Sequence, residues 1–211
     1  FMEQHSEFGM VYTSAYCIDE DGIPLRARYE AEVSGWIYKH IAFFVPVTIA
    51  LPTVMVRRKI FESAGSFDVN MDRFEDTDMW RRISKQCLIG AMPEFTCRLR
   101  THLDNALVAQ DPHKIFRALE YYVQKIHKQD TNVSLILRRK GIAKLYGYYG
   151  SAMMTDPTRR KLGYILFLRG IRSWPFDFKI ILRFVAYIFY HGYCWVKAIV
   201  LKRRTHLRNI K

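Results

Sequence analysis

The sequence predicts an α/β fold, with a sheet-containing half in residues 1–107 and an α-helical region in residues 108–211. Short segments rich in Val, Tyr, Thr and Ile alternate with short helical segments in the first half, and long segments of helical period follow. Half of the 211 residues are apolar, which excludes disordered and collagen-like proteins. The charge divides similarly: residues 1–100 hold 12 basic and 14 acidic side chains, and residues 101–211 hold 21 basic and 6 acidic side chains.

The elements of the first half follow from local composition. Residues 8–18 are strand-like, and Asp19–Gly22 is a turn in which the glycine can take positive φ. Residues 75–86 predict the clearest helix, because acids fill its first turn and bases follow. The remaining predictions are a strand at 23–28, a helix at 29–40, a proline-containing loop at 41–52, a strand at 53–58, a helix at 59–65 closed by Gly65, and one interrupted strand or two short strands around Pro93 at 87–101.

The second half predicts four helices, at 111–128, 132–152, 157–173 and 176–201. The last is apolar nearly all round, rich in aromatics and followed by a basic tail. Its longest uncharged apolar stretch, Phe184 to Val196, is shorter than the roughly 20 residues that a membrane span needs. We therefore expect a helix lying on an anionic membrane surface, peripheral and on the cytoplasmic face, with packing on neighbouring helices as the alternative.

The cysteines and the start of the chain bear on its compartment. Four scattered cysteines without metal-finger spacing favour reduced thiols of a cytosolic protein over disulfides: Cys17, Cys87, Cys97 and Cys194. The first residues show no signal-peptide pattern. Because Phe1 is not an initiator Met and an apolar alternating run begins shortly after it, we expect a fragment of a longer protein.

A dense set of acids surrounds the start of the predicted 75–86 helix. Glu75, Asp76 and Asp78 lie within four residues, and Asp72 precedes them. Acids at a helix start cap free N–H groups and match the helix dipole. Carboxylates this close also repel one another, which raises a pKa and can yield a base that works near neutral pH. Both interpretations stay open on these residues alone.

The order of motifs around these acids resembles a known family. Arg57-Arg58 precedes a short helix, and A-G-S-F-D (64–68) and E-D-T-D-M-W-R-R (75–82) follow. In combination, over about residues 8–105, these motifs resemble the acceptor half of the family 2 glycosyltransferases, inverting enzymes of the GT-A fold. The resemblance implies a partial GT-A (Rossmann-like) sheet, a nucleotide-sugar donor, a saccharide or lipid-linked acceptor, a divalent metal (Mg or Mn) and a role in cell-surface polysaccharide or glycolipid synthesis.

The resemblance also assigns roles on the acceptor side. Asp76, the aspartate after the glutamate of E-D-x-D, is the expected catalytic base, which removes the proton of the attacking acceptor hydroxyl. Glu75 and Trp80 are expected to contact the acceptor. The alternative for the glutamate is support of the Asp76 carboxylate, and the alternative for the tryptophan is a core position. Asp78 is expected to pair with Arg81 or Arg82.

On the donor side, the resemblance assigns basic residues and a histidine. Arg57, Arg58 and Arg100 are expected to bind the donor diphosphate, although strand-end arginines such as the first two are also often simply solvated. His102 is expected to contact the metal, as a ligand, or the diphosphate, with an ordinary polar surface residue as the alternative. The family's nucleotide-binding half, with its metal-binding D-x-D, has no counterpart in these residues, so we expect this chain alone to be inactive.

Two other function classes compete with an enzyme. In a non-catalytic membrane-surface scaffold, the acids would merely cap a helix. A nucleic-acid-binding protein would use the net charge of +15 on residues 101–211. However, the basic clusters there are short, they alternate with long aromatic helices, and no zinc-finger or ribonucleoprotein-type motif accompanies them. We therefore expect no nucleic-acid partner.

Overall fold

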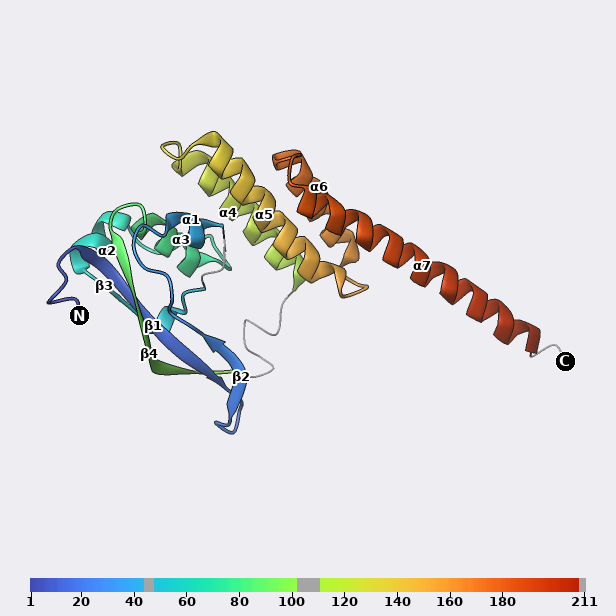
Figure 1. Cartoon of the computed structure of the whole chain (residues 1–211), viewed down its shortest axis with the longest axis horizontal. Helices are drawn as coiled ribbons and strands as arrows, with labels where there is room; N and C mark the ends of the chain where they lie inside the picture. Colours follow the sequence, from blue (N-terminus) through green and yellow to red (C-terminus); the bar gives the residue numbers. More distant parts are fainter. Residues whose placement is uncertain (44–47, 102–110, 209–211) are drawn as a thin grey trace. The chain divides into compact units, whose positions relative to one another are not determined.

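A computed structural model describes residues 1–43, 48–101 and 111–208, with side chains described as far as Tyr193. It confirms the predicted α/β class, with a four-stranded sheet followed by long helices (Figure 1). The elements are β1 (Phe8–Ile18), β2 (Pro24–Tyr29), α1 (Tyr38–Ala42), the 3-10 helix η1 (Leu51–Thr53), β3 (Val54–Val56), α2 (Arg58–Ala64), α3 (Glu75–Ile83), β4 (Leu88–Arg100), α4 (Pro112–Gln129), α5 (Leu135–Met154), α6 (Arg160–Ser173) and α7 (Phe178–Arg208).

The chain divides into two compact units, Phe1–Gly141 and Ile142–Lys211, called here the N-terminal and C-terminal units. This division differs from the boundary predicted at 107/108, because α4 belongs with the sheet. Ion pairs between α4 and the loop and helix that precede β4, described below, explain why.

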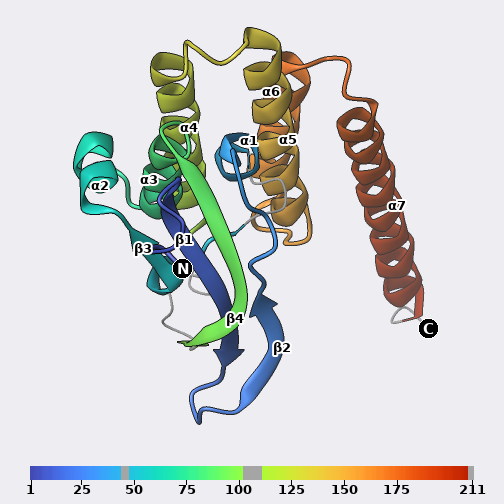
Figure 2. The same ribbon diagram turned by 60° about the vertical axis from the view of Figure 1, so that its left-hand side comes forward.

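Strand β1 is the centre of a mixed sheet. Strand β4 runs parallel to it along its whole length, from the Phe8–Leu88 pair to the Ile18–Arg100 pair (Figures 1 and 2). On the other edge, β3 pairs antiparallel with the first part of β1 and β2 with the last part. The two ends of β1 therefore have different neighbours, β3 at the N-terminal end and β2 at the C-terminal end.

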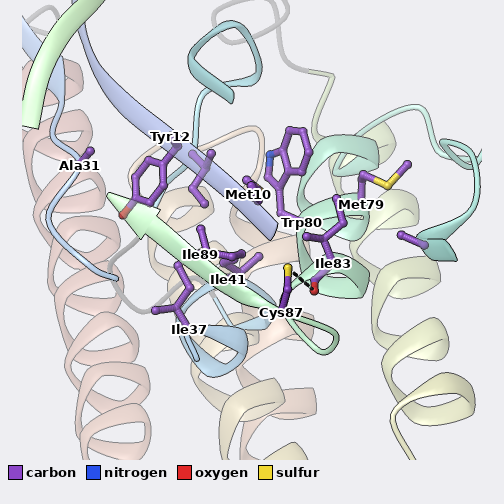
Figure 3. Packing of buried hydrophobic residues seen from close by; sticks show 12 residues of the cluster. Met10, Tyr12, Ala31, Ile37, Ile41, Met79, Trp80, Ile83, Cys87 and Ile89 are labelled. Carbon is purple, nitrogen blue, oxygen red and sulfur yellow. Dashed lines mark hydrogen bonds between the residues drawn. The ribbon is translucent and has the colours of Figure 1, made fainter. Parts of the chain in front are cut away.

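The core of the N-terminal unit lies between the sheet and α3 (Figure 3). Met10 and Tyr12 are two residues apart on β1, so they share a face, and Ile89 of β4 joins them. Trp80 and Ile83 of α3 pack into the same cluster. Full burial of side chains of this size stabilises the fold by about 1.5–3 kcal/mol each. This packing fixes α3 against the sheet.

The helix predicted at 29–40 is wrong for most of its length. The backbone N–H of Ala31 donates to Ser14 Oγ at 2.9 Å, and Gly35, with φ of 100°, exchanges backbone hydrogen bonds with Ile89 at 2.8 and 3.1 Å. Only the short helix α1 forms near the end of this stretch. Hydrogen bonds to the sheet therefore override a helix propensity that is worth only tenths of a kcal/mol per residue.

The stretch at 87–101 forms one interrupted strand, the first of the two predicted alternatives. Its register with β1 shifts between Thr13 and Ser14, where Pro93 and Glu94 are skipped. Proline has no N–H to donate to a ladder, so it is found at a bulge.

Most of the other predicted elements are confirmed within a few residues. Gly65 closes α2 with φ of 78°, as expected for a C-terminal cap. The four predicted C-terminal helices correspond to α4–α7, and α7 continues beyond its predicted end to Arg208. Cys17, Cys87 and Cys97 are free thiols, as predicted, and Cys194 lies outside the residues whose side chains are described.

The C-terminal unit packs through aromatic side chains and close helix contacts. Phe167 of α6 is fully buried, with its ring 5.7 Å from that of Phe184 and 5.9 Å from that of Tyr187, both on α7. Two glycines bring α5 and α6 together, since a Cβ on Gly163 would lie 3.1 Å from the carbonyl oxygen of Gly150. No helix in the described part of the chain combines the length and hydropathy needed to cross a bilayer.

Candidate functional site

The first turn of α3 presents two of the predicted acids to solvent. Glu75 is exposed and Asp76 is half-buried. Asp76 Oδ1 accepts hydrogen bonds from the backbone N–H of Thr77 at 2.6 Å and from its hydroxyl at 3.2 Å. The helix follows Phe74, which has φ of 65°, the one left-handed backbone among the described non-glycine residues. Because a bulky residue in this region costs roughly 1–2 kcal/mol, the surrounding structure must hold this turn in place.

Asp78, one turn into α3, is surrounded by cations. Its fully buried carboxylate accepts hydrogen bonds from Arg81 at 2.8 Å, Arg82 at 3.0 Å and Lys125 at 2.7 Å. The predicted pairing of Asp78 with a following arginine is therefore confirmed. This carboxylate stabilises the structure and has no free oxygen to offer a substrate.

Lys125 of α4 joins the two acidic motifs. Its Nζ lies 2.7 Å from Asp68, in the A-G-S-F-D segment, and 2.7 Å from Asp78, in the E-D-T-D segment. Tyr121, four residues earlier on α4, donates its hydroxyl to Asp68 at 3.1 Å. Segments that are separate in the sequence are thereby held together at the start of α3.

A second buried carboxylate completes this network at the end of α4. Asp130 is fully buried and accepts hydrogen bonds from Arg81, from Tyr38 and from Lys85, the last at 2.8 Å. Arg81, also fully buried, bridges Asp130 and Asp78. Removing one partner of such a buried set leaves an uncompensated charge, which is strongly destabilising.

The ion pairs set the protonation of these groups. The hydrogen bond from Lys125 lowers the pKa of Asp68 to about 2. Burial acts to raise the pKa of Asp78, but the hydrogen bonds from Lys125 and Arg81 outweigh it and lower the pKa. Burial and the neighbouring Asp130 raise the pKa of the Tyr38 hydroxyl. Asp68 and Asp78 are therefore charged at neutral pH and engaged with cations, so neither is suited to act as a base.

Trp80 requires a correction. The side chain is 4% exposed and belongs to the core cluster (Figure 3). Its ring meets that of Phe67 edge-on at 6.3 Å. A ring with so little exposed surface cannot lie against a sugar, so the acceptor-binding role does not fit. The core position, which was the alternative, is the one observed.

The three arginines assigned to the donor diphosphate also require a correction, because they lie at opposite ends of β1. The N–H of Arg57 donates to Gly9 at 2.9 Å, near the start of β1, whereas Arg100 pairs with Ile18 at its end. Nine residues of strand separate these points by about 30 Å. One diphosphate cannot contact both ends.

Each of these arginines also has other contacts. Arg57 donates to backbone carbonyl oxygens of the N-terminal segment, including those of Phe8 at 2.8 Å and His5 at 3.2 Å. Arg58 is exposed, 4.0 Å from Glu62. Arg100 donates to the carbonyl oxygen of Asp19 at 3.0 Å, in the turn between β1 and β2. Arg57 and Arg100 therefore stabilise the N-terminal segment, the sheet and its turn, whereas Arg58 is exposed on the surface of α2.

The predicted metal ligand His102 lies outside the described residues. Within the described ranges, no group of three or more His, Cys, Asp or Glu side chains is placed to hold a metal ion. The closely grouped carboxylates of Asp68 and Asp78 are engaged by Lys125 and arginines. The described residues thus do not form a ligand set for the expected divalent metal.

Comparison with models of known protein families and with curated protein sequences gives no match for the chain.

The sequence analysis missed the residues that organise the site, Lys125 and Asp130. Lys125 carried a detectable signal, because it falls on the face of the predicted 111–128 helix that also holds Ile115, Leu119, Tyr122 and Ile126. A lysine among apolar residues at helical spacing indicates a buried ion pair with a partner elsewhere. Asp130 follows the last turn of that helix, and the residues around it show no pattern that indicates a buried ion pair.

Proposed function

We propose that this chain is the acceptor side of an inverting glycosyltransferase and that Asp76 is its catalytic base. The observation that carries the proposal is the difference in burial and in pairing with cations among the acids of E-D-T-D. Asp78 is buried and engaged by three cations, whereas Asp76 and Glu75 stay accessible at the same helix start. Simple helix capping does not require the two kinds of acid to be separated in this way.

The chemistry follows from the position of Asp76. A carboxylate oxygen takes the proton of the acceptor hydroxyl while that oxygen attacks the anomeric carbon of the donor sugar, and the nucleotide diphosphate leaves from the opposite face. Hydrogen bonds from Thr77 orient the Asp76 carboxylate. In this proposal Glu75, which is exposed, accepts a hydrogen bond from a second hydroxyl of the acceptor.

The buried network supports this role by holding the helix start still. Asp78 is held by Arg81 of its own helix and by Lys125 of α4. The aromatic ring of Phe74 lies 6.0 Å from that of Tyr122 on α4. Positioning of the reacting groups is a large part of catalysis, and a shift of about 1 Å can cost roughly a hundredfold in rate. The proposed partners are a nucleotide-sugar donor and a saccharide or lipid-linked acceptor. Arg57, Arg58, Arg100 and Trp80 are not part of the proposed site.

The test is a transfer assay on the protein translated from the whole reading frame that encodes this chain. A panel of nucleotide sugars and saccharide or lipid-linked acceptors is screened for release of nucleoside diphosphate and for glycosylated product. Asp76→Asn should lower the rate by about a hundredfold or more, because the amide cannot accept the proton. Asp72→Asn, a matched change at an exposed acid just upstream, should leave the rate unchanged.

Circular dichroism of both variants should match the parent, because neither side chain is part of the core. Parental activity in Asp76→Asn would show that Asp76 is not the catalytic base. Absence of transfer by the parent with every donor and acceptor of the panel would instead favour the scaffold alternative.

A further inference from the structure

Over residues 178–193, the part of helix α7 whose side chains are described, the helix has two apolar faces, and only one of them is covered within the C-terminal unit. The covered face packs against α6: Tyr164 of α6 lies 5.8 Å ring-to-ring from Phe184, and its hydroxyl is 2.9 Å from Nδ1 of His191. Ile180, at the start of the same face, is 4% exposed. The residues of this inner face recur at helical spacing: Ile180, Phe184, Tyr187 and His191.

The opposite face of α7 is also apolar, and it is exposed. Its residues are spaced by four, three, four and four positions, so they form one stripe about 180° from the inner face. Three of them are more than two-thirds exposed: Phe178 at 71%, Leu182 at 68% and Phe189 at 73%. The outer stripe is Phe178, Leu182, Val185, Phe189 and Tyr193. A contiguous apolar surface of this kind on a folded unit indicates contact with another apolar phase or partner.

The charges along α7 favour an anionic lipid surface as that partner. Residues 178–211 contain eight Lys and Arg residues and no Asp or Glu. Lys179 and Arg183 lie on the flank of the helix between its two faces, at about 100° per residue. An amphipathic helix with an aromatic and aliphatic face flanked by bases matches the interface of an anionic bilayer. Nucleic acid would require the bases, rather than the aromatics, at the centre of the exposed face.

A groove on the same flank adds a second, independent observation. Its volume is about 640 Å³, and it is lined by Ser151 of α5 and by Arg183, Ala186, Tyr187 and Tyr190 of α7. The hydroxyl of Ser151 is buried and has no hydrogen-bond partner among the described residues. Most of this lining is apolar, and the guanidinium of Arg183 supplies its charged donor for a phosphate group.

The groove and the outer stripe fit one orientation on a membrane. If the stripe enters the acyl boundary, the flank that carries Arg183 lies at the depth of the lipid headgroups, because it is about a quarter turn away around the helix. We propose that α7 lies in the plane of an anionic leaflet, with the outer stripe immersed and Arg183 holding a lipid phosphate at the groove. This inference goes beyond the proposed sugar transfer and does not depend on it.

The experiment is flotation of the full chain with vesicles of phosphatidylcholine, alone or mixed with phosphatidylglycerol. The parent should bind the mixed vesicles much more tightly. The double variant Leu182→Gln/Phe189→Gln should lower the partition coefficient by at least about tenfold, since two large apolar side chains leave the bilayer. The single variant Arg183→Gln should lower binding to the mixed vesicles by about fivefold, the value of one base near an anionic surface, and should change binding to phosphatidylcholine little.

The matched control is Leu135→Gln/Ile136→Gln, at exposed apolar positions of α5 in the N-terminal unit, 55% and 59% exposed. This control should bind vesicles like the parent. Equal loss in the control, or parental binding of the outer-stripe variant, would overturn the proposal. A dimer in solution that Leu182→Gln/Phe189→Gln converts to a monomer, without vesicle binding by the parent, would instead show that a second copy covers the stripe and would also overturn it.

Discussion

The two compact units use charge and apolar surface in opposite ways. In the N-terminal unit, the strongest electrostatic contacts are buried, and the side chains of Asp78, Arg81 and Asp130 have no exposed surface. In the C-terminal unit, the buried contacts are aromatic, and large apolar side chains such as Leu182 and Phe189 face outward.

This contrast indicates a different role for the buried and exposed side chains in each unit. A buried ion network is costly to desolvate and is no better for stability than an apolar core, so its value lies in fixing positions. In the N-terminal unit, the fixed element is the start of α3, with Glu75 and Asp76. An exposed apolar stripe is unfavourable in water, and this is the basis of the proposed contact between the C-terminal unit and a membrane surface.

The largest expected effect comes from cutting the buried network at its centre. Arg81→Met should destabilise the N-terminal unit by about 3–5 kcal/mol, because two fully buried carboxylates, Asp78 and Asp130, lose a shared partner. Urea unfolding followed by tryptophan fluorescence measures the change, since Trp80 lies in the core beside the network.

The control for that experiment is an exposed arginine in the same unit. Arg58→Met removes a surface ion pair of 4.0 Å with Glu62, in which both side chains are mostly exposed, and should leave the midpoint unchanged. If Arg81→Met unfolded at the same urea concentration as Arg58→Met, the network would not hold the N-terminal unit and the contrast between the units would fail.

Local patterns were enough to predict most of the fold. The strand at 8–18 and the helix at 75–86 depend on side-chain alternation and on acids in a first turn, which neighbouring residues decide. The helix at 29–40 failed because partners far away in the sequence, Ser14 and Ile89, engage its backbone. No pattern within the segment contains that information.

The candidate site was less predictable, for the same reason. Asp76 could be selected from its position in a motif, whereas Lys125 is 47 residues from Asp78 and only the fold brings them together. The separation of Arg57 from Arg100 depends on strand order and register, because β3 and the end of β4 meet opposite ends of β1. A motif assigns roles without this geometry, and so it grouped side chains that lie too far apart to share one diphosphate.

A smaller effect is expected from acid. The folded pKa of Asp68 is about 2, below the roughly 3.9 of an unfolded aspartate, so its pairing with Lys125 stabilises the fold above about pH 5 and is lost as the pH falls toward 2. Asp68→Asn should therefore be about 2 kcal/mol less stable than the parent near neutral pH, and the difference should shrink in acid. Urea midpoints at a series of pH values measure this difference in stability.

The control is Asp72→Asn, at an exposed position, which should be as stable as the parent at every pH. If the loss of stability in Asp68→Asn persisted undiminished in acid, the ion pair would be ruled out as its cause.

The smallest effect is expected from glycine-to-alanine changes in the C-terminal unit, which compare an open helix surface with a tightly packed helix crossing. Gly192 lies within α7, and a Cβ there would meet no atom within 4 Å, so Gly192→Ala should stabilise the helix by about 0.5–1 kcal/mol. At Gly163 the same methyl group would lie 3.1 Å from the carbonyl oxygen of Gly150 and 3.1 Å from the sulfur of Met154. There the gain in helix propensity is opposed by overpacking, and Gly163→Ala should be less stable than the parent. Amide hydrogen exchange in α6 and α7 reports both changes. Equal gains at the two glycines would mean that α5 and α6 are packed loosely enough to admit a methyl group, and the buried half of the C-terminal unit would then lack the close packing that distinguishes it from the exposed stripe.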